Sequence, residues 1–408
     1  MSDRTDVVVS GLGIIGPGGL DAATSWDTLC RGEPTARADA SLAGQSAQFS
    51  CRTPEFDASA LLGAQTARRT DRFTHLGIIA AREAVASAGL DPRAWDDARV
   101  GVVSGTSMGG TPSYEAQSAR MSHNGSSGVS AMTIPMFLPN MLAGHLSLAF
   151  GAHGPSFTVN SACASGATAI GTARDLLRLG VCDIVLAGGA EAAVSRQCAA
   201  AFARMNALST RNQEPSLASR PFDTERDGFV LSEGAAMLVL ERADGARARD
   251  HRPLARIVGY GASADAHHIS APHPQGAGLE RAIRKALADA DADCSDVDHI
   301  SAHATSTPLG DIVEARVISR LFPHQPSVTA LKGTLGHSLG AASAVEVAVA
   351  ILTIANSLIP PTANLRQQDP EVPLDVVTGS ARPATVRCAL KNAAGYGGQN
   401  AVLLIAPP

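Results

Sequence analysis

The sequence has few charged residues and no paired cysteine motif. Charged residues make up 17% of the 408-residue chain, against 45% apolar residues. This balance favours extensive burial in a compact protein that hides further surface in a dimer. A formal net charge of -5 gives no reason to expect nucleic-acid binding, so any basic surface for a partner must be local.

The seven cysteines include no Cys-x-x-Cys pair and are odd in number. This pattern argues against a disulfide framework and against a zinc site, so we expect reduced thiols and no metal. The first residues, MSDRTDVVVSGLGIIGPGG, combine early acidic residues with a short apolar run that glycines interrupt. They predict neither a signal peptide nor a membrane span. The expected location is therefore cytoplasmic, with no membrane partner.

Helical and strand-like segments alternate along the chain. THLGIIAAREAVASAGL has helical spacing, whereas DARVGVVSG and DIVLAGG are short β-branched runs, which predicts an α/β protein with largely buried strands. No linker or low-complexity stretch divides the chain. A strand, turn and helix around Cys163 recur around His303 in DHISAHATSTPLGDIVEARVISRLF. We therefore expect two related halves, residues 1–250 and 251–408, that bring these turns to one crevice.

A glycine cluster near the start matches the pattern of a dinucleotide-binding turn. Gly11, Gly13 and Gly16 satisfy G-x-G-x-x-G directly after the run DVVVS. However, the sequence PGG follows where a helix should begin. We therefore favour a glycine-rich loop that leads into a helix over residues 22–29.

Cys163 lies in the segment SFTVNSACASGATAIGTARDLLRLG. The alternation through Phe157 and Val159 predicts a strand, and residues 164–179 have helical spacing that stops at Gly180. Cys163 is therefore expected at the strand-to-helix turn, where free amides and the positive helix end favour a thiolate. A cysteine among alanines is also often an inert core residue, so this segment alone leaves both interpretations open.

Two of the twelve histidines lie in short turns rich in glycine and threonine. They are His303 in SAHATSTPLGD and His337 in LKGTLGHSLGAASAVE. A cysteine and two such histidines suit either a protease-like pair or a site that forms carbon–carbon bonds. Both kinds of site need a thiolate and a polarised carbonyl group.

Four motifs, NSACASG, AHATSTPLGD, KGTLGHSLGAA and GYGGQN, stand in this order. They resemble the Cys, His, Lys-His and glycine-rich motifs of β-ketoacyl-acyl-carrier-protein synthases of the synthase II type, and the similarity runs from about Asp6 to Leu404. The resemblance implies an α/β, thiolase-like fold of two duplicated halves with α-β-α-β-α layers. It also implies decarboxylative condensation of malonyl-ACP with an acyl chain on Cys163. No cofactor is implied, since acyl groups arrive on the phosphopantetheine of acyl carrier protein.

By the same resemblance, Cys163, His303, Lys332 and His337 are catalytic. Lys332 is expected to pair with Glu314, and the amides of Cys163 and Tyr396 are expected to form an oxyanion hole, with Tyr396 also at the gate. Further positions are implied for the malonyl and pantetheine arm (Thr305, Thr307), the acyl tunnel (Met108, Phe202) and carrier-protein docking (Arg68, Arg69, Arg72, Arg211).

Several of these residues have a simpler structural interpretation. Asp311 and Glu314 form an Asp-x-x-Glu pattern before an apolar helical run, so we expect Asp311 to be structural, as a helix N-cap. The threonines are also typical of turns, the apolar tunnel residues of a core, and the arginines of a solvated helix face.

The chain also departs from the usual pattern of the family it resembles. Tyr396 stands where housekeeping synthases carry a gating phenylalanine, and Ala304 replaces a glycine. These departures suggest a specialised type II polyketide or polyene pathway, with housekeeping fatty-acid elongation as the alternative. A cysteine hydrolase and a noncatalytic carrier-protein-binding subunit are alternatives of other classes. The sequence leaves open the acyl chain and whether the partner is an identical subunit or a chain-length-factor-like one.

Overall fold

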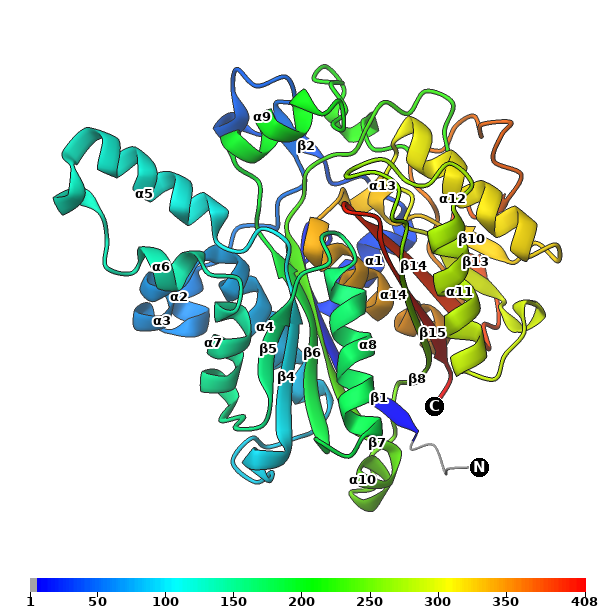
Figure 1. The fold of residues 1–408 in the computed structure, drawn as a ribbon, viewed down its shortest axis with the longest axis horizontal. Helices are drawn as coiled ribbons and strands as arrows, with labels where there is room; N and C mark the ends of the chain where they lie inside the picture. The colour runs from blue at the N-terminus through cyan, green and yellow to red at the C-terminus, as the bar shows by residue number, and fades with distance from the viewer. Residues whose placement is uncertain (1–5) are drawn as a thin grey trace.

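The computed structural model describes residues 6–408, so the first five residues of the predicted N-terminal half lie outside it. A sheet of eleven strands forms its centre (Figure 1). Its strands are β1 (Val7–Ile15), β4 (Val100–Gly105), β5 (Ser156–Val159), β6 (Ile184–Glu191), β7 (Gly234–Arg242), β8 (Ala255–Ala264), β9 (His299–Ser301), β10 (Ser327–Thr329), β12 (Asp375–Val376), β14 (Ala389–Gly395) and β15 (Gln399–Ala406). Two short pairs lie apart from it, β2 (Arg37–Ala38) with β3 (Phe49–Ser50) and β11 (Leu358–Ile359) with β13 (Arg382–Pro383).

The large sheet consists of two halves with the same topology. The first half has the order β1-β7-β6-β4-β5 and the second has the order β8-β15-β14-β9-β10, with β12 beyond β10 as an eleventh strand that has no counterpart. In each half the first three strands are antiparallel neighbours and the last three are parallel neighbours. The halves join where Val8 pairs with Arg256 and Val9 with Ala255. This repeated order confirms the duplicated α/β fold.

The helices surround and separate the two halves. They are α1 (Ala22–Arg31), α2 (Ala58–Leu62), α3 (Ala64–Arg69), α4 (Arg72–Ser87), α5 (Thr111–Asn124), α6 (Thr133–Phe137), α7 (Met141–Phe150), α8 (Ser165–Arg178), α9 (Arg196–Arg204), α10 (Ala243–Ala248), α11 (Ala277–Asp289), α12 (Pro308–Leu321), α13 (Lys332–Leu335) and α14 (Ala342–Asn356). The boundary predicted at residue 250 falls between α10 and β8.

Helices α8 and α14 form the middle layer of the molecule (Figure 1). Helix α8 contacts β4 and β6 of the first half and β15 of the second, and α14 contacts β7 and β14. Helix α4 covers the other face of the first half and α11 covers that of the second. The five layers therefore follow the predicted α-β-α-β-α order.

The stretch Leu339–Asn356, which includes α14, is long and apolar enough to cross a membrane by length and composition. It is 83% buried inside the fold, where its side chains belong to the largest core cluster. Its apolar character is therefore explained by its place between the two halves of the sheet.

The N-terminal glycines serve packing and a turn. Gly11 and Gly13 lie within β1, and a Cβ on Gly11 would stand 2.2 Å from the carbonyl oxygen of Ala84 on α4. Gly16 and Gly19 pair across a tight turn that leads into α1. The glycine-rich loop before a helix is thus confirmed. A dinucleotide-binding turn does not form, because two of its three glycines lie inside a strand.

Gly166 on α8 offers a test of the close packing in the middle layer. A Cβ at this position would lie 2.6 Å from the backbone nitrogen of Ala344 on α14. We expect Gly166→Ala to lower the free energy of unfolding by about 1–3 kcal/mol, because backbone must shift to admit the methyl group. The measurement is the thermal unfolding midpoint. Gly245→Ala on α10 is the control, since no atom lies within 4 Å of its added Cβ. Equal midpoints would contradict the packing argument.

Candidate active site

Cys163 lies in the turn that connects β5 to α8, as predicted. Ala162 adopts a φ of +50°, in the left-handed region that residues with a Cβ rarely occupy. Helix α8 begins two residues after the cysteine, at Ser165. This bend places Cys163 directly before the N-terminal end of a central helix. The predicted helix of residues 164–179 is confirmed to within one residue at each end.

The loop between β14 and β15 packs directly against this turn. A Cβ on Gly395, the last residue of β14, would lie 2.3 Å from the carbonyl oxygen of Ser161, so the strand end can come this close only with glycine. The approach brings the backbone N–H of Tyr396 to the sulfur of Cys163, where the N–H of Cys163 also donates. Two backbone donors therefore meet at the same thiol.

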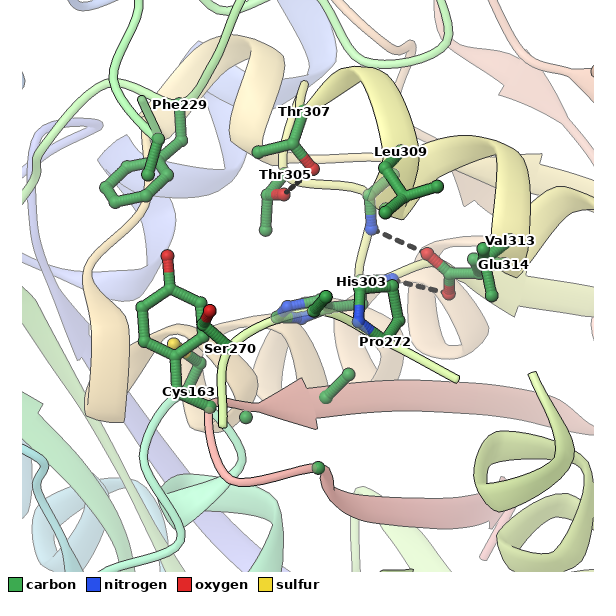
Figure 2. Close-up of a pocket in the computed structure, with 18 of the residues that line it drawn as sticks. Cys163, Phe229, Ser270, Pro272, His303, Thr305, Thr307, Leu309, Val313 and Glu314 are labelled. Atoms are coloured by element: carbon green, nitrogen blue, oxygen red, sulfur yellow. Dashed lines mark hydrogen bonds between the residues drawn. The ribbon is translucent and has the colours of Figure 1, made fainter. Parts of the chain in front are cut away.

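A cavity of about 370 Å³ opens beside Cys163 (Figure 2). Figure 2 shows Thr305, Thr307 and Phe229 across this space from Cys163, with His303 beside it. Eight residues predicted to form the site line the cavity: Cys163, Phe202, His303, Thr305, Thr307, Glu314, His337 and Tyr396. The structure thus brings the cysteine turn and the histidine turns to one crevice.

The two histidines face each other edge to face. Their ring centroids lie 5.6 Å apart with an interplanar angle of 83°, and Phe229 packs against His337 in the same manner at 5.2 Å. Burial lowers the pKa of both imidazoles well below the ordinary value, and the positive charge of Lys332 lowers it further. Both rings are therefore neutral at neutral pH and each carries one N–H donor.

The thiol of Cys163 differs from the sequence expectation. Burial raises its pKa to about 12, and the opposing charge of Lys332 does not compensate. The cysteine packs in an apolar cluster with Val194, Phe229 and Leu339, where a thiolate loses its hydration. Burial therefore opposes the thiolate that the helix end is expected to favour, and the raised pKa predicts a thiol in the unliganded site.

Lys332 is fully buried at the first position of α13. Its Nζ donates to the carbonyl oxygen of His303 at 2.7 Å and to Oε1 of Glu346 at 2.5 Å. The predicted pairing of Lys332 with Glu314 is therefore wrong. Helix α14 brings Glu346 under the ammonium group, whereas the carboxylate of Glu314 has other partners.

Glu314 holds the backbone of the histidine turn. Its two carboxylate oxygens accept the backbone N–H groups of His303 at 2.8 Å and of Ala304 at 2.7 Å, as the dashed lines in Figure 2 show. The side chain of Asn392 donates to Oε1 at 3.0 Å. Glu314 therefore fixes where His303 enters the cavity without contacting the lysine.

Asp311 is structural, but it is not the N-cap of its helix. Thr307 takes the N-cap position, and Pro308 follows as the first residue of α12. Asp311 lies one turn further, where its carboxylate accepts the backbone N–H groups of Ser306 at 3.1 Å and Phe222 at 2.9 Å. Burial raises its pKa to about 7. The N-cap prediction was wrong because proline fixes the start of the helix three residues earlier.

The duplicated topology also corrects the predicted internal repeat. Cys163 follows β5, the third strand of the first half in chain order, whose counterpart is β10. The first helix after β10 is α13, which begins at Lys332. His303 instead follows β9, which is the counterpart of β4. The structural equivalent of the cysteine turn is therefore the segment between β10 and α14, which carries Lys332 and His337, and the sequence likeness to the turn around His303 does not reflect the repeat.

Sequence reasoning missed two charged residues at this site. Glu346 is the single charged residue of α14, and Lys391 is a wholly buried lysine on β14 whose Nζ lies 2.9 Å from Oε2 of Glu346. Their signal was present. The chain has three lysines, and Lys391 interrupts an apolar strand just as Glu346 interrupts an apolar helix. A lone charge in such a run predicts a buried ion pair.

Glu191 is a further buried carboxylate that the sequence did not reveal. It ends β6 and accepts the backbone N–H groups of Ser107 at 2.7 Å, Met108 at 3.2 Å and Gly340 at 3.2 Å. It therefore ties the loop after β4 to the turn before α14. Met108 is half-buried and packs beside the apolar cluster that holds Cys163, but it is not among the residues that line the cavity.

The four predicted docking arginines differ in their surroundings. Arg68 and Arg69 end α3 and are exposed. Arg72 makes two hydrogen bonds to the buried carboxylate of Glu233, at 2.8 and 2.6 Å. Arg211 donates to the carbonyl oxygen of Glu225 at 2.7 Å. Arg68 and Arg69 thus present their charge to solvent, whereas Arg72 and Arg211 make hydrogen bonds within the protein.

The sequence matches known proteins along nearly its whole length. The profile described as "Beta-ketoacyl synthase, N-terminal domain" matches residues 4–246, and that of the C-terminal domain matches residues 254–366. A 3-oxoacyl-[acyl-carrier-protein] synthase 2 of Synechocystis sp. is 39% identical, with 98% of both chains covered. A synthase 2 of Staphylococcus aureus is 37% identical, with 99% of both chains covered.

Solved structures agree with this likeness. The ishigamide ketosynthase/chain length factor superposes with a TM-score of 0.94 at 33% identity, over 99% of this chain and all of that one. This neighbour confirms the thiolase-like ketosynthase fold. The chain therefore belongs to the β-ketoacyl synthase family and is a ketosynthase, an acyltransferase of the 3-oxoacyl-[acyl-carrier-protein] synthase type.

Proposed function

We propose that the enzyme joins malonyl-ACP to an acyl chain held on Cys163, with loss of carbon dioxide, in a specialised type II polyketide or polyene pathway. One observation carries the chemistry. Cys163, two neutral histidines and two backbone donors converge on a single cavity. A cysteine hydrolase needs no buried lysine beside its histidines, and a noncatalytic subunit needs none of these groups together.

In the first half-reaction, the sulfur of Cys163 attacks the thioester carbonyl of acyl-ACP. The carbonyl oxygen gains negative charge, which the N–H groups of Cys163 and Tyr396 stabilise. The bond to the pantetheine sulfur then breaks, and that sulfur leaves with the proton that the Cys163 thiol gives up. Acyl-Cys163 and free holo-ACP result, so no charge stays in the apolar pocket around the sulfur.

In the second half-reaction, malonyl-ACP loses carbon dioxide and the bonding electrons pass to its α-carbon. The thioester oxygen of the resulting enolate accepts hydrogen bonds from the neutral rings of His303 and His337. The α-carbon attacks the acyl carbonyl, a carbon–carbon bond forms and the bond to Cys163 sulfur breaks. The sulfur takes up a proton from solvent water, and a β-ketoacyl chain two carbons longer stays on the carrier.

The specialised pathway rests on Tyr396 and on the solved relatives. The Tyr396 ring lines the cavity with its centroid 6.2 Å from that of Phe202, so the acyl chain meets a polar group at this point. Such a wall suits an unsaturated or oxygenated chain better than a saturated one. Besides the ishigamide ketosynthase, the fold superposes on a type II PKS ketosynthase in complex with its acyl-carrier protein, with a TM-score of 0.91 at 26% identity over all of both chains.

The proposed partners are acyl carrier protein and a second subunit. Arg68 and Arg69 offer a basic docking site for an acidic carrier protein. Strand β5 ends the large sheet and contacts α7, and α7 in turn contacts α6. Apolar side chains lie exposed on α5 and α6, namely Tyr114, Met121 and Ile134. This edge suits a second copy or a chain-length-factor-like subunit. A cytoplasmic location, without metal or cofactor, is part of the same proposal.

Acyl loading tests the nucleophile and the pathway together. Wild-type protein mixed with acyl-ACPs of different length and unsaturation should gain one acyl group, detected by intact-protein mass spectrometry. Cys163→Ala should gain none, because the attacking sulfur is gone. Enoyl or β-keto chains should load faster than saturated ones. Faster loading and turnover with saturated chains would sink the specialised pathway and favour fatty-acid elongation.

The histidines should act mainly in the second half-reaction. His303→Ala and His337→Ala are expected to slow malonyl-ACP decarboxylation by about 10²–10³-fold, since each removes a donor to the enolate. Carbon dioxide release measures this step, while mass spectrometry follows acyl loading, which should change less. Variants that decarboxylate malonyl-ACP normally but do not transfer an acyl group to Cys163 would show that the histidines act in the first half-reaction instead.

The raised pKa of Cys163 predicts how its alkylation depends on pH. A thiol with a pKa near 12 is mostly protonated below that value, so the rate with iodoacetamide should rise about tenfold per pH unit between pH 7 and pH 9. Mass spectrometry of the Cys163 peptide separates this reaction from those of the other six cysteines. A rate that levels off near pH 7 would mean that a thiolate is already present.

A further inference from the structure

Two of the three lysines in the chain converge on one buried carboxylate. Lys332 reaches Oε1 of Glu346 at 2.5 Å, and Lys391 reaches Oε2 at 2.9 Å. All three side chains are at most 3% exposed. The pair of Lys332 and Glu346 is already balanced in charge, so Lys391 adds a second positive charge to the core.

The other neighbours of Lys391 are backbone carbonyl oxygens. Its Nζ donates to Ser301 at 3.3 Å, to Ala302 at 3.2 Å and to Asn392. With the carboxylate of Glu346, four oxygen acceptors surround the nitrogen. Burial lowers the pKa of Lys391, whereas the carboxylates of Glu346 and Glu314 raise it. The ammonium form offers three N–H donors and no lone pair, so it suits a shell of acceptors better than the neutral amine does. Carbonyl and carboxylate oxygens arranged in this way also form the coordination shell that a monovalent cation prefers.

This oxygen shell adjoins the histidine turn. Lys391 on β14 stands opposite Ser301 on β9, and Ser301 and Ala302 directly precede His303. The carbonyl group of His303 itself accepts from Lys332. Consecutive carbonyl groups of residues 301–303 are therefore held by two ammonium groups that share one carboxylate.

We propose that Lys391 acts as a built-in monovalent cation, a positioning residue that fixes Glu346 and the end of β9 so that Lys332 and His303 keep their places. The inference rests on the role proposed for His303 in decarboxylation. Shortening Lys391 would leave four oxygens around a space that a potassium or ammonium ion can fill. The side chain therefore makes the enzyme independent of a bound ion at this point.

The charge of Lys391 also acts on the histidines. The charged groups that act on the two rings are Lys332 on α13 and Lys391 on β14. Glu346 on α14 pairs with both lysines, Glu314 on α12 binds the backbone of His303, and Cys163 and Tyr396 line the same cavity. Both lysines lower the pKa of both rings. Without Lys391 the pKa of each ring rises, so protonation of the rings and loss of activity begin at a higher pH.

Cation rescue of Lys391→Ala is the test. In choline chloride the variant should release carbon dioxide from malonyl-ACP about 10–100-fold more slowly than wild type. The reason is that a small displacement of the reacting groups slows the reaction. Potassium or ammonium chloride should restore much of the rate, whereas tetramethylammonium, which is too large for the space, should not. The same small cations should raise the thermal unfolding midpoint of the variant, which is a readout independent of catalysis.

Lys391→Met is the matched variant, because it fills the space without a charge. Its rate of malonyl-ACP decarboxylation should be low, and small cations should not restore it. As the pH is lowered, its activity should begin to fall at a higher pH than that of wild type. Lys285→Ala, which removes the exposed third lysine, should behave as wild type in every assay. The proposal is overturned if Lys391→Met keeps the wild-type rate and pH profile, or if small cations change neither rate nor midpoint of Lys391→Ala. Acyl loading of wild-type Cys163 separately tests the proposed function.

Discussion

The buried carboxylate of Glu346 is the interaction on which the second half of the site depends. It stands on α14, in the layer shared by both halves, and its two oxygens pair with ammonium groups from α13 and β14 at once. Uncompensated charges in such a core would be very costly, so both lysines depend on this carboxylate. Because Lys332 also binds the carbonyl group of His303, this charge cluster sets the position of a histidine that lies at the cavity.

The first half contributes a different kind of constraint, which is steric. The left-handed residue Ala162 and the side-chain-free Gly395 let two backbone segments meet at Cys163. The sulfur is dry enough to stay protonated, and the same dryness strengthens every hydrogen bond offered to a charge that develops there. A site built in this way favours reactions in which charge appears only briefly. The Cys163 thiol then loses its proton only when it attacks a bound thioester.

Much of this architecture could be predicted from local sequence. The strand, turn and helix around Cys163 follow from short-range apolar spacing, and the four motifs indicated which turns would meet. The pairings that were missed or wrong are long-range. Arg72 meets Glu233, and Lys391 meets Glu346, through contacts that only the packed layers create. The protonation of Cys163 also depends on burial by residues far along the chain, such as Leu339. The local sequence pattern cannot show whether the helix end, which lowers the pKa of Cys163, or burial, which raises it, has the larger effect.

The middle layer has a consequence for how the protein is made. Helix α8 ends at Arg178, but α14, against which it packs, is complete only at Asn356. At about 5–20 residues per second, a ribosome leaves the inner face of the first half uncovered for on the order of 10 s or more after α8 has been synthesised. During that interval the inner face of the first half carries α1 and α8 but lacks α14. The duplicated design, which gives the finished enzyme a dry centre, therefore leaves the inner face of its first half incomplete until most of the chain has been made.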